Sequence, residues 1–142
     1  MKARPGAGYS GTPLPKKLGM KPGMIVAFLG APSSFASALG TLPERVTLRR
    51  GMKGTADLVL WFVRSGRELT RSIRLVAAFA GTANVWIAWR KKAARAKDDP
   101  GGADAPDEQG VRTAGLATDL VDFKVCAIDV EWSALLFARR RQ

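Results

Sequence analysis

Apolar residues occur along this chain in short continuous runs separated by polar turns, a pattern typical of a sheet that is covered on both faces. Four such runs predict strands, at 24–30, 46–50, 57–63 and 84–90. Two further strands are predicted at 122–129 and 133–140, and only three residues separate them. So short a connection favours an antiparallel hairpin, because a parallel crossover needs many more residues.

Helical patterns fall between these runs. Residues 66–80 carry arginines around an apolar stripe that repeats every three to four positions, which predicts an amphipathic helix. The stripe comprises Leu69, Ile73, Val76, Ala77 and Ala80. Residues 33–39 predict a short helix with Ser33 as its N-cap. A weaker helix is predicted from about Asp107 to Ala117, where acidic residues suit the helix N-terminus.

Strands that alternate with helices and end in a hairpin predict an α/β fold: a three-layer sandwich around a mostly parallel sheet of about six strands. One connection is short, since about six residues separate the second and third strands and a parallel crossover usually takes about a dozen. Two explanations stay open. Either this connection is stretched taut, or 46–50 is a short edge strand whose direction the sequence does not assign.

Composition divides the chain into an arm and one domain. Residues 1–23 are rich in Gly, Pro and Lys and predict an extended arm with at most one helical turn. Residues 24–142 predict a single α/β domain that carries an acidic loop at about 93–106. No apolar run approaches the roughly 18 residues that cross a membrane, and the first residues lack the apolar segment of a signal peptide. We therefore expect a soluble, cytoplasmic protein.

The formal net charge of +11 is unevenly distributed. Five of the 12 acidic residues lie in 98–108, so the rest of the chain carries 23 basic residues against 7 acidic ones, or +16. Such a field attracts phosphate-bearing ligands, nucleic acids or anionic surfaces. The alternative is that scattered Lys and Arg side chains only solvate a small domain. Few aromatic residues lie among the bases, so the indication of nucleic-acid binding is weak.

The reactive residue types exclude several chemistries. The chain has no His, which removes His-based triads, His general bases and the commonest metal ligand. Its single cysteine, Cys126, permits neither an internal disulfide nor a cysteine zinc cluster, so no metal site is predicted. Cys126 lies on a predicted strand and is expected to be a buried, unreactive thiol. Neither Ser10 nor Ser33 has a recognisable base partner, so no catalytic residue is predicted.

The stretch at 21–35, KPGMIVAFLGAPSSF, joins a Pro-Gly turn to a buried strand and a loop with a glycine and two serines. Together with the order of the elements, it resembles the start of the Rossmann-like class I methyltransferases, with one strand-helix unit missing from the chain. Those enzymes begin with a pattern of the type P-G-x-x-V-L-D-x-G-x-G-x-G. Pro22, Gly23, Val26 and Gly30 agree with it. The resemblance implies a site for S-adenosylmethionine after the first strand.

The same stretch departs from the pattern where the cofactor is usually held. Phe28 stands at the acidic position, and Pro32 and Ser34 stand at the second and third glycines. Proline has no N–H to donate, and its ring fills space that glycine leaves open. Arg49 and Arg50 replace the acid expected at the end of the second strand, and an arginine there could suit a phosphorylated nucleotide. We therefore predict no cofactor in the usual mode.

Three longer stretches carry a second resemblance: GYSGTPLPKKLGMKPG, VWIAWRKK and LVDFKVCAIDVEWSALLF. Over nearly the whole chain they are similar to the uncharacterised bacterial family catalogued as domain of unknown function 3052. Members usually carry G-Y-S-x-T-P-L-x-K-K-L-G, W-x-S-W-P-K-K and G-L-V-D-x-K-V-C-A-I-D-x-x-W-S-G-L-K-F. This chain departs from them at Arg90, Asp119, Ala134 and Leu136. The resemblance supports the fold and names no activity.

Basic residues follow several of the predicted strands. Ligands of open α/β sheets bind beyond the carboxyl ends of the strands, near the point where the strand order reverses. Beside the Ser33 cap, this edge should gather five bases, namely Arg64, Arg67, Arg90, Lys91 and Lys92. They predict a pocket for an anion or an anionic partner. The alternative is that strand ends are charged because they are solvated.

Two further groups are candidates for contacts. Asp129, Trp132 and Ser133 lie at the predicted hairpin turn. The tryptophan could be a lid or stacking platform with Asp129 as a polar anchor, or Asp129 could accept turn N–H groups while Trp132 packs over the sheet edge. In the arm, Tyr9 and Ser10 should dock either onto the chain's own body or onto a second copy, so a homodimer stays open.

These patterns favour a non-catalytic Rossmann-like domain that binds a protein or a small anionic molecule, without cofactor or membrane. Two alternatives stay open. One is a small transferase with an atypical S-adenosylmethionine or nucleotide site, and the other is sequence-independent nucleic-acid binding. The loop after the first strand distinguishes the enzyme from the binding domain, because only the enzyme needs room there for an adenosine ligand.

Overall fold

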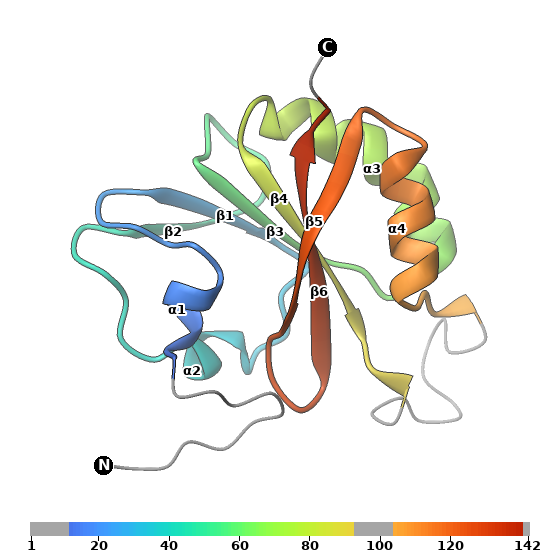
Figure 1. Ribbon diagram of the computed structural model, residues 1–142. Helices are drawn as coiled ribbons and strands as arrows, with labels where there is room; N and C mark the ends of the chain where they lie inside the picture. Colours follow the sequence, from blue (N-terminus) through green and yellow to red (C-terminus); the bar gives the residue numbers. More distant parts are fainter. Residues whose placement is uncertain (1–11, 93–103, 141–142) are drawn as a thin grey trace.

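The computed structural model describes residues 12–92 and 104–140, which form one sheet with helices on both faces (Figure 1). The longer helices α3 and α4 cover one face, and the short helices α1 and α2 lie on the other. The strands are β1 (Ile25–Leu29), β2 (Thr47–Arg50), β3 (Leu58–Phe62), β4 (Asn84–Arg90), β5 (Leu120–Ala127) and β6 (Trp132–Arg139). The helices are α1 (Leu14–Lys17), α2 (Phe35–Leu39), α3 (Gly66–Ala80) and α4 (Glu108–Leu116).

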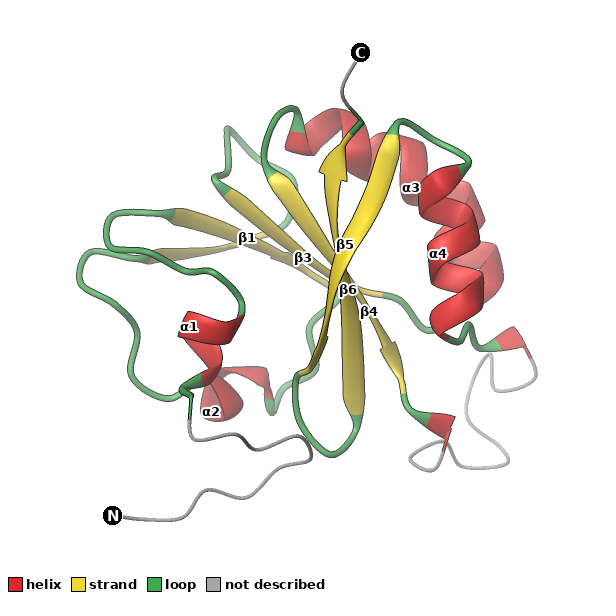
Figure 2. Cartoon of the chain, in the orientation of Figure 1, coloured by secondary structure: helices red, strands yellow, loops and turns green. Residues whose placement is uncertain are grey.

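The six strands lie in the order β2-β1-β3-β4-β6-β5 (Figure 2). Strands β1 to β4 are parallel, and β6 runs antiparallel to both β4 and β5. This confirms the predicted α/β sandwich and its terminal hairpin. The chain leaves β1 toward β2 on one side, whereas it leaves β3 toward β4 on the other. The strand order therefore reverses between β1 and β3, where α/β sheets commonly bind ligands.

The direction of the second strand, which the sequence left open, is parallel to β1 at the edge of the sheet. The seven residues 51–57 carry the chain back to the start of β3. Extended chain spans about 3.3–3.6 Å per residue, so this connection can cross a strand of five residues without a helix. Arg49 holds it, because its Nη1 donates to the carbonyl oxygens of Lys53 and Thr55, both at 3.0 Å.

The sequence predicts the bounds of the two longer helices closely. The predicted helix at 66–80 has the bounds of α3, and all five residues of its apolar stripe are buried. Ser65 caps it by accepting a hydrogen bond from the N–H of Glu68 at 3.0 Å. Helix α4 is one residue shorter at each end than predicted, and Asp107 caps it through the N–H of Gly110. Within the described ranges, no helix is long and apolar enough to cross a membrane.

The core consists of two apolar layers, one on each face of the sheet. The layer beneath α1 and α2 includes Leu18 and Met20, which follow α1 and are both buried. Trp86, at the centre of β4, donates its indole N–H to the carbonyl oxygen of Leu18 at 2.8 Å. The helical turn expected near the start of the chain is therefore fastened to the middle of the sheet.

Candidate functional site

Most of the predicted site residues come together at one edge of the sheet. The carboxyl ends of β1, β3 and β4 lie at this edge, and the β5–β6 turn joins them because Arg90 at the end of β4 is paired with Trp132 at the start of β6. We call it the carboxyl edge; it carries Arg64, Arg90, Lys91, Lys92, Asp129, Trp132 and Ser133. Arg67 lies exposed in the first turn of α3. Tyr9 and Ser10 lie outside the described residues.

At the point where the strand order reverses, an arginine bridges the loops that follow β1 and β3. Arg64 Nη1 donates to the carbonyl oxygen of Gly30 at 2.8 Å, and its guanidinium carbon lies 5.3 Å from the ring centroid of Trp132. Gly30 has φ 69°, and a Cβ there would lie 2.9 Å from the carbonyl oxygen of Phe62. The two loops therefore approach so closely that only glycine fits this position.

The predicted cap of α2 is wrong. The helix begins at Phe35, so Ser34 rather than Ser33 precedes it, and Ser34 makes no side-chain cap bond. A turn closed by the N–H of Phe35 on the carbonyl oxygen of Pro32 delays the helix by two residues. Ser34 also has helical dihedral angles (φ −80°, ψ −5°) instead of the extended ones of a capping residue. Ser33 is left exposed in the loop.

A row of aromatic rings lies behind this loop. The centroid distances are 6.1 Å from Phe28 to Phe35, 5.1 Å from Phe35 to Phe62, and 5.2 Å from Phe62 to Trp132. The last two contacts are edge-to-face, the geometry that aromatic pairs prefer. A guanidinium covers each end of the row, because Arg50 lies 5.7 Å from the Phe28 centroid just as Arg64 lies over Trp132.

The aromatic row affects whether S-adenosylmethionine could bind at the ends of β1 and β2. Phe28 and Arg50 are the residues at two positions where class I methyltransferases are expected to carry acids, and here they contact each other. Pro32 offers no N–H to a ligand. The ends of β1 and β2 therefore do not fit S-adenosylmethionine in the mode that the sequence pattern of those enzymes implies.

The β5–β6 turn is held by its own polar groups. Asp129 Oδ1 accepts hydrogen bonds from the N–H groups of Glu131 and Trp132, both at 2.8 Å, so Asp129 has the structural role that the sequence offered as one alternative. Arg90 forms an ion pair with Glu131 at 2.8 Å, and Lys91 Nζ donates to the carbonyl oxygen of Asp129. Two of the predicted anion-binding bases thus brace this turn.

The predicted place of Trp132 in the turn is wrong. Trp132 is the first residue of β6, because its ladder with β4 continues to Arg90 and its carbonyl oxygen accepts the N–H of Ile128. Its side chain is 2% exposed, so it is a core residue and not a lid. The indole Nε1 is buried without a hydrogen-bond partner in the described part of the chain.

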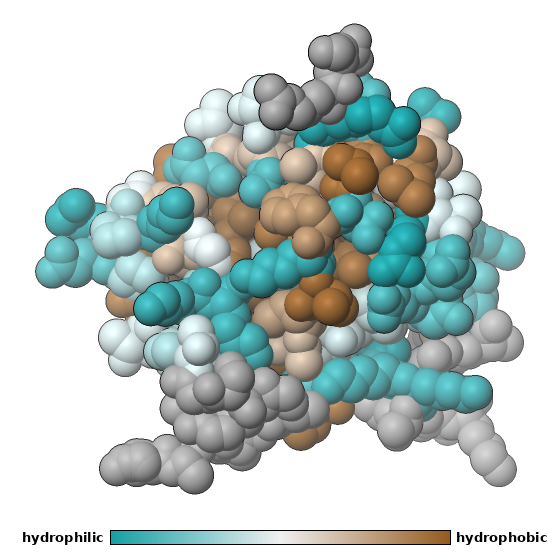
Figure 3. Space-filling view, in the orientation of Figure 1, coloured by the Kyte–Doolittle hydropathy of each residue, from teal (hydrophilic) through white to brown (hydrophobic). Residues whose placement is uncertain are grey.

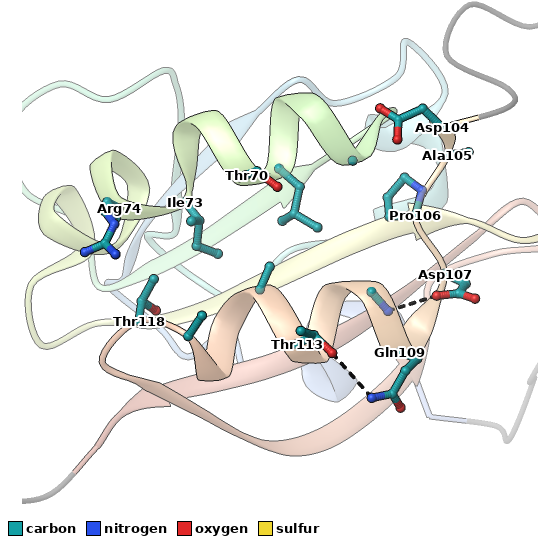
Figure 4. Close-up of a pocket in the computed structure, with 15 residues that line it drawn as sticks. Thr70, Ile73, Arg74, Asp104, Ala105, Pro106, Asp107, Gln109, Thr113 and Thr118 are labelled. Atoms are coloured by element: carbon teal, nitrogen blue, oxygen red, sulfur yellow. Dashed lines mark hydrogen bonds between the residues drawn. The ribbon is translucent and has the colours of Figure 1, made fainter.

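One hollow of the surface lies away from the strand ends, between α3 and α4 (Figure 4). It has a volume of about 730 Å³, and its lining includes the apolar residues Leu69 and Ile73. At one end Asp104 Oδ2 accepts the N–H of Arg67 at 2.9 Å. A smaller hollow of about 560 Å³ opens on the carboxyl edge; it is lined by Trp89, Lys91, Lys92, Ala105, Asp107, Glu108 and Ser133.

An apolar strip on the edge strand β5 was not expected from the sequence. Val121, Phe123 and Val125 are 39%, 56% and 55% exposed, and apolar side chains are visible over β5 in Figure 3. A bulge contributes to the strip: Asp122 pairs with Phe137 and Lys124 with Leu136, which leaves Phe123 without a partner on β6.

Sequence reasoning also missed Glu131 and Glu68 as partners of site arginines. Glu131 neutralises Arg90 across the hairpin, and Glu68 accepts the backbone N–H of Arg64 at 2.9 Å. The second contact had a signal, because Ser65 followed by Glu68 three residues later is typical of a helix start. The contact between Glu131 and Arg90 depends on the register of β4 and β6, which no local sequence pattern predicts.

Cys126 is buried as expected, with 6% of its surface exposed. Burial raises the pKa of the Cys126 thiol, and the charges of Lys17 and Lys124 oppose that shift without cancelling it. The folded protein therefore keeps the thiol protonated to higher pH than the unfolded chain does. The corresponding contribution to the free energy of unfolding is present below the unfolded pKa of about 8.5, and is lost as pH rises through the folded pKa.

We expect a thiol reagent at pH 8 to label Cys126 at least about tenfold more slowly in the native protein than in urea, because reaction needs an exposed thiolate. The release of the chromophore from Ellman's reagent measures both rates, and free cysteine at each urea concentration is the control. Equal rates in the two states would contradict the burial of this residue.

Comparison with known proteins supports the fold and not a family. No family model matches the chain, and no curated protein matches it. Among solved structures it is similar to a putative type 11 methyltransferase from Sulfolobus solfataricus (13% identity, 91% of this chain and 90% of that chain, TM-score 0.61). It is also similar to a SAM dependent methyltransferase from Aquifex aeolicus (14% identity, 86% and 85%, TM-score 0.57). A protein in the NADB-Rossmann superfamily from Streptococcus agalactiae matches at 9% identity (94% and 70%, TM-score 0.56).

These neighbours correct the functional expectation from the sequence. A non-catalytic binding domain was favoured because the cofactor loop departs from the methyltransferase pattern. The structures that share this fold over most of the chain are instead largely named as methyltransferases. The fold is that of methyltransferases, so the preference for a non-catalytic domain does not stand.

Proposed function

We propose that this chain is a small group transferase that binds an adenosyl cofactor, either S-adenosylmethionine or a nucleotide, at the carboxyl edge in an atypical mode. The observation that carries the proposal is the reversal of strand order between β1 and β3, where Arg64 bridges the loops that follow the two strands. Methyltransferase structures of the same fold, covering up to 91% of this chain, support it. Membership of the bacterial family catalogued as domain of unknown function 3052 remains a proposal beside it.

The described residues support a binding and positioning role for the carboxyl edge. Arg64 places its guanidinium over Trp132 at one end of the aromatic row, and the smaller hollow beside Ser133 adds Lys91 and Lys92 at the same edge of the sheet. Asp129 and Glu131 are engaged by backbone N–H groups and by Arg90, so they hold the turn and do not serve as free bases. We therefore assign ligand orientation to this edge and no proton transfer to any of its carboxylates.

Adenosyl ligands test the proposal. We expect at least one of S-adenosylmethionine, S-adenosylhomocysteine, adenosine and ADP to raise the melting temperature at low salt. A ligand present at 100 times its Kd stabilises the folded state by about 2.7 kcal/mol, a shift that calorimetry resolves easily. Uridine is the matched control, because it keeps the ribose and lacks the adenine.

Native mass spectrometry of the protein as purified complements this measurement, since it detects an adenosyl compound that is already bound. If none of the four compounds changes the melting temperature and no adenosyl mass is retained, the proposed function is wrong. If one of them binds, transfer of a radiolabelled methyl or phosphoryl group to cell-extract components tests the chemistry.

A further inference from the structure

The geometry points to a phosphate-bearing adenine nucleotide, and not S-adenosylmethionine, as the ligand of the carboxyl edge. This inference rests on the proposed function and names the chemical class of its cofactor. We infer that Arg50 and Arg64, one at each end of the aromatic row, bind the phosphates beside the loop that follows β1.

Arg50 and Arg64 provide positive charge for an anionic ligand. In the described part of the chain neither guanidinium pairs with a carboxylate: Arg64 donates to the Gly30 carbonyl and Arg50 lies over Phe28. The nearby acids are engaged, since Glu68 accepts the backbone N–H of Arg64 and Glu131 pairs with Arg90. The two guanidinium groups thus keep their charge available for an anion.

The charge of the ligand also distinguishes a nucleotide from S-adenosylmethionine. S-Adenosylmethionine carries a sulfonium and an ammonium against one carboxylate, so its net charge is positive and Arg64 repels its reactive centre. A nucleotide phosphate is negative and is attracted by the same group. The acids that would favour the ribose hydroxyls of S-adenosylmethionine are replaced by Phe28 and Arg50. Both differences favour the nucleotide.

Both arginine side chains are preorganised for binding. The side chains of Arg50 and Arg64 are each supported by an aromatic face, and Arg64 is also fixed by its 2.8 Å hydrogen bond to Gly30. Arginine held in this way loses less conformational entropy on binding and offers a planar fork that matches phosphate oxygens. Strands β2 and β3 flank β1, so the two arginines approach the loop that follows β1 from opposite sides.

Isothermal titration calorimetry with adenosine, ADP and S-adenosylhomocysteine tests the inference at low salt. We expect ADP to bind at least about tenfold more tightly than either of the other two, and its affinity to fall as salt is raised. Arg50→Met and Arg64→Met should each weaken ADP binding about tenfold or more, the usual effect of losing a hydrogen bond to a charged group, and leave adenosine binding unchanged.

The matched control is Arg74→Met, which removes the same charge from an exposed position on α3 about 12 Å along the helix from its first turn. It should leave the ADP affinity unchanged. Because Arg64 also fixes the Gly30 loop, Arg64→Lys serves as a second variant that keeps the charge and loses the planar guanidinium group. We expect its affinity for ADP to lie between those of the parent protein and Arg64→Met. Circular dichroism confirms that each variant is folded.

The outcomes separate the inference from the proposed function. If S-adenosylhomocysteine binds more tightly than ADP, the inference is wrong and the proposed function stands. If ADP binds and both methionine variants bind it as the parent does, the site assignment is wrong. If no adenosyl compound binds, the inference and the proposed function both fail.

Discussion

Trp132→Ala should lower the free energy of unfolding by about 3–5 kcal/mol, the cost of removing a large aromatic side chain from a packed core. Trp132 is 2% exposed, closes the aromatic row against Phe62, and supports the guanidinium of Arg64. Its removal therefore leaves a cavity next to the candidate site and also destabilises the fold. Urea unfolding followed by circular dichroism measures the change without relying on tryptophan fluorescence.

Trp132→Phe is the informative control. It keeps a ring against Phe62 and removes an indole N–H that has no partner among the described residues. Because no hydrogen bond is lost, this variant should cost less than about 2 kcal/mol. A cost equal to that of the alanine variant would mean that the indole N–H, and not the ring packing, stabilises this part of the core.

Gly115→Ala in α4 should destabilise the protein by about 2 kcal/mol, against the usual effect of alanine in a helix. Alanine normally gains about 0.5–1 kcal/mol over glycine at such a position. A Cβ at Gly115, however, would overlap the ring of Phe137, which is fully buried in the core beneath α4 and has no room to move away. Overpacking of this kind costs about 1–3 kcal/mol or more, so the steric cost exceeds the gain in helix propensity.

The same helix offers the matched control. A Cβ at Gly110 would meet Asp107 Oδ1 at 3.4 Å and Pro106 Cβ at 3.8 Å, which are ordinary contacts. Gly110→Ala should therefore stabilise the protein by about 0.5–1 kcal/mol. Thermal and urea unfolding of the two variants should change in opposite directions. If both are stabilised, α4 does not pack on β6 as closely as the structure has it.

The residues of the candidate site were easier to predict than their contacts. Arg64, Arg90 and Lys91 were expected at the carboxyl edge because each directly follows or ends a buried strand, and they lie there. Their partners were not predicted. Arg90 pairs with Glu131 and Lys91 with the Asp129 carbonyl because β6 lies beside β4, a pairing that no local pattern encodes.

Two positions were misassigned for a related reason. Ser33 is a good helix cap by residue type, yet the turn between Pro32 and Phe35 starts the helix later. Trp132 followed the predicted turn residues Val130 and Glu131, yet its ladder with β4 makes it the start of a strand. In both cases a hydrogen bond decided the boundary: a bond within a local turn for Ser33, and the pairing with β4 across the sheet for Trp132.

The sequence by itself determined the α/β class, the bounds of α3 and β4, the hairpin and the burial of Cys126. It could do so because a buried face of a helix or strand requires apolar residues at regular spacings, which can be recognised in the sequence. A short connection also leaves few ways to join two strands. Tertiary structure alone decided the parallel direction of β2, the reversal of strand order between β1 and β3, and the hydrogen bond from Arg64 to the Gly30 carbonyl oxygen. These features join residues 22 to 34 positions apart, so they follow from the order and register of the strands and not from any local pattern.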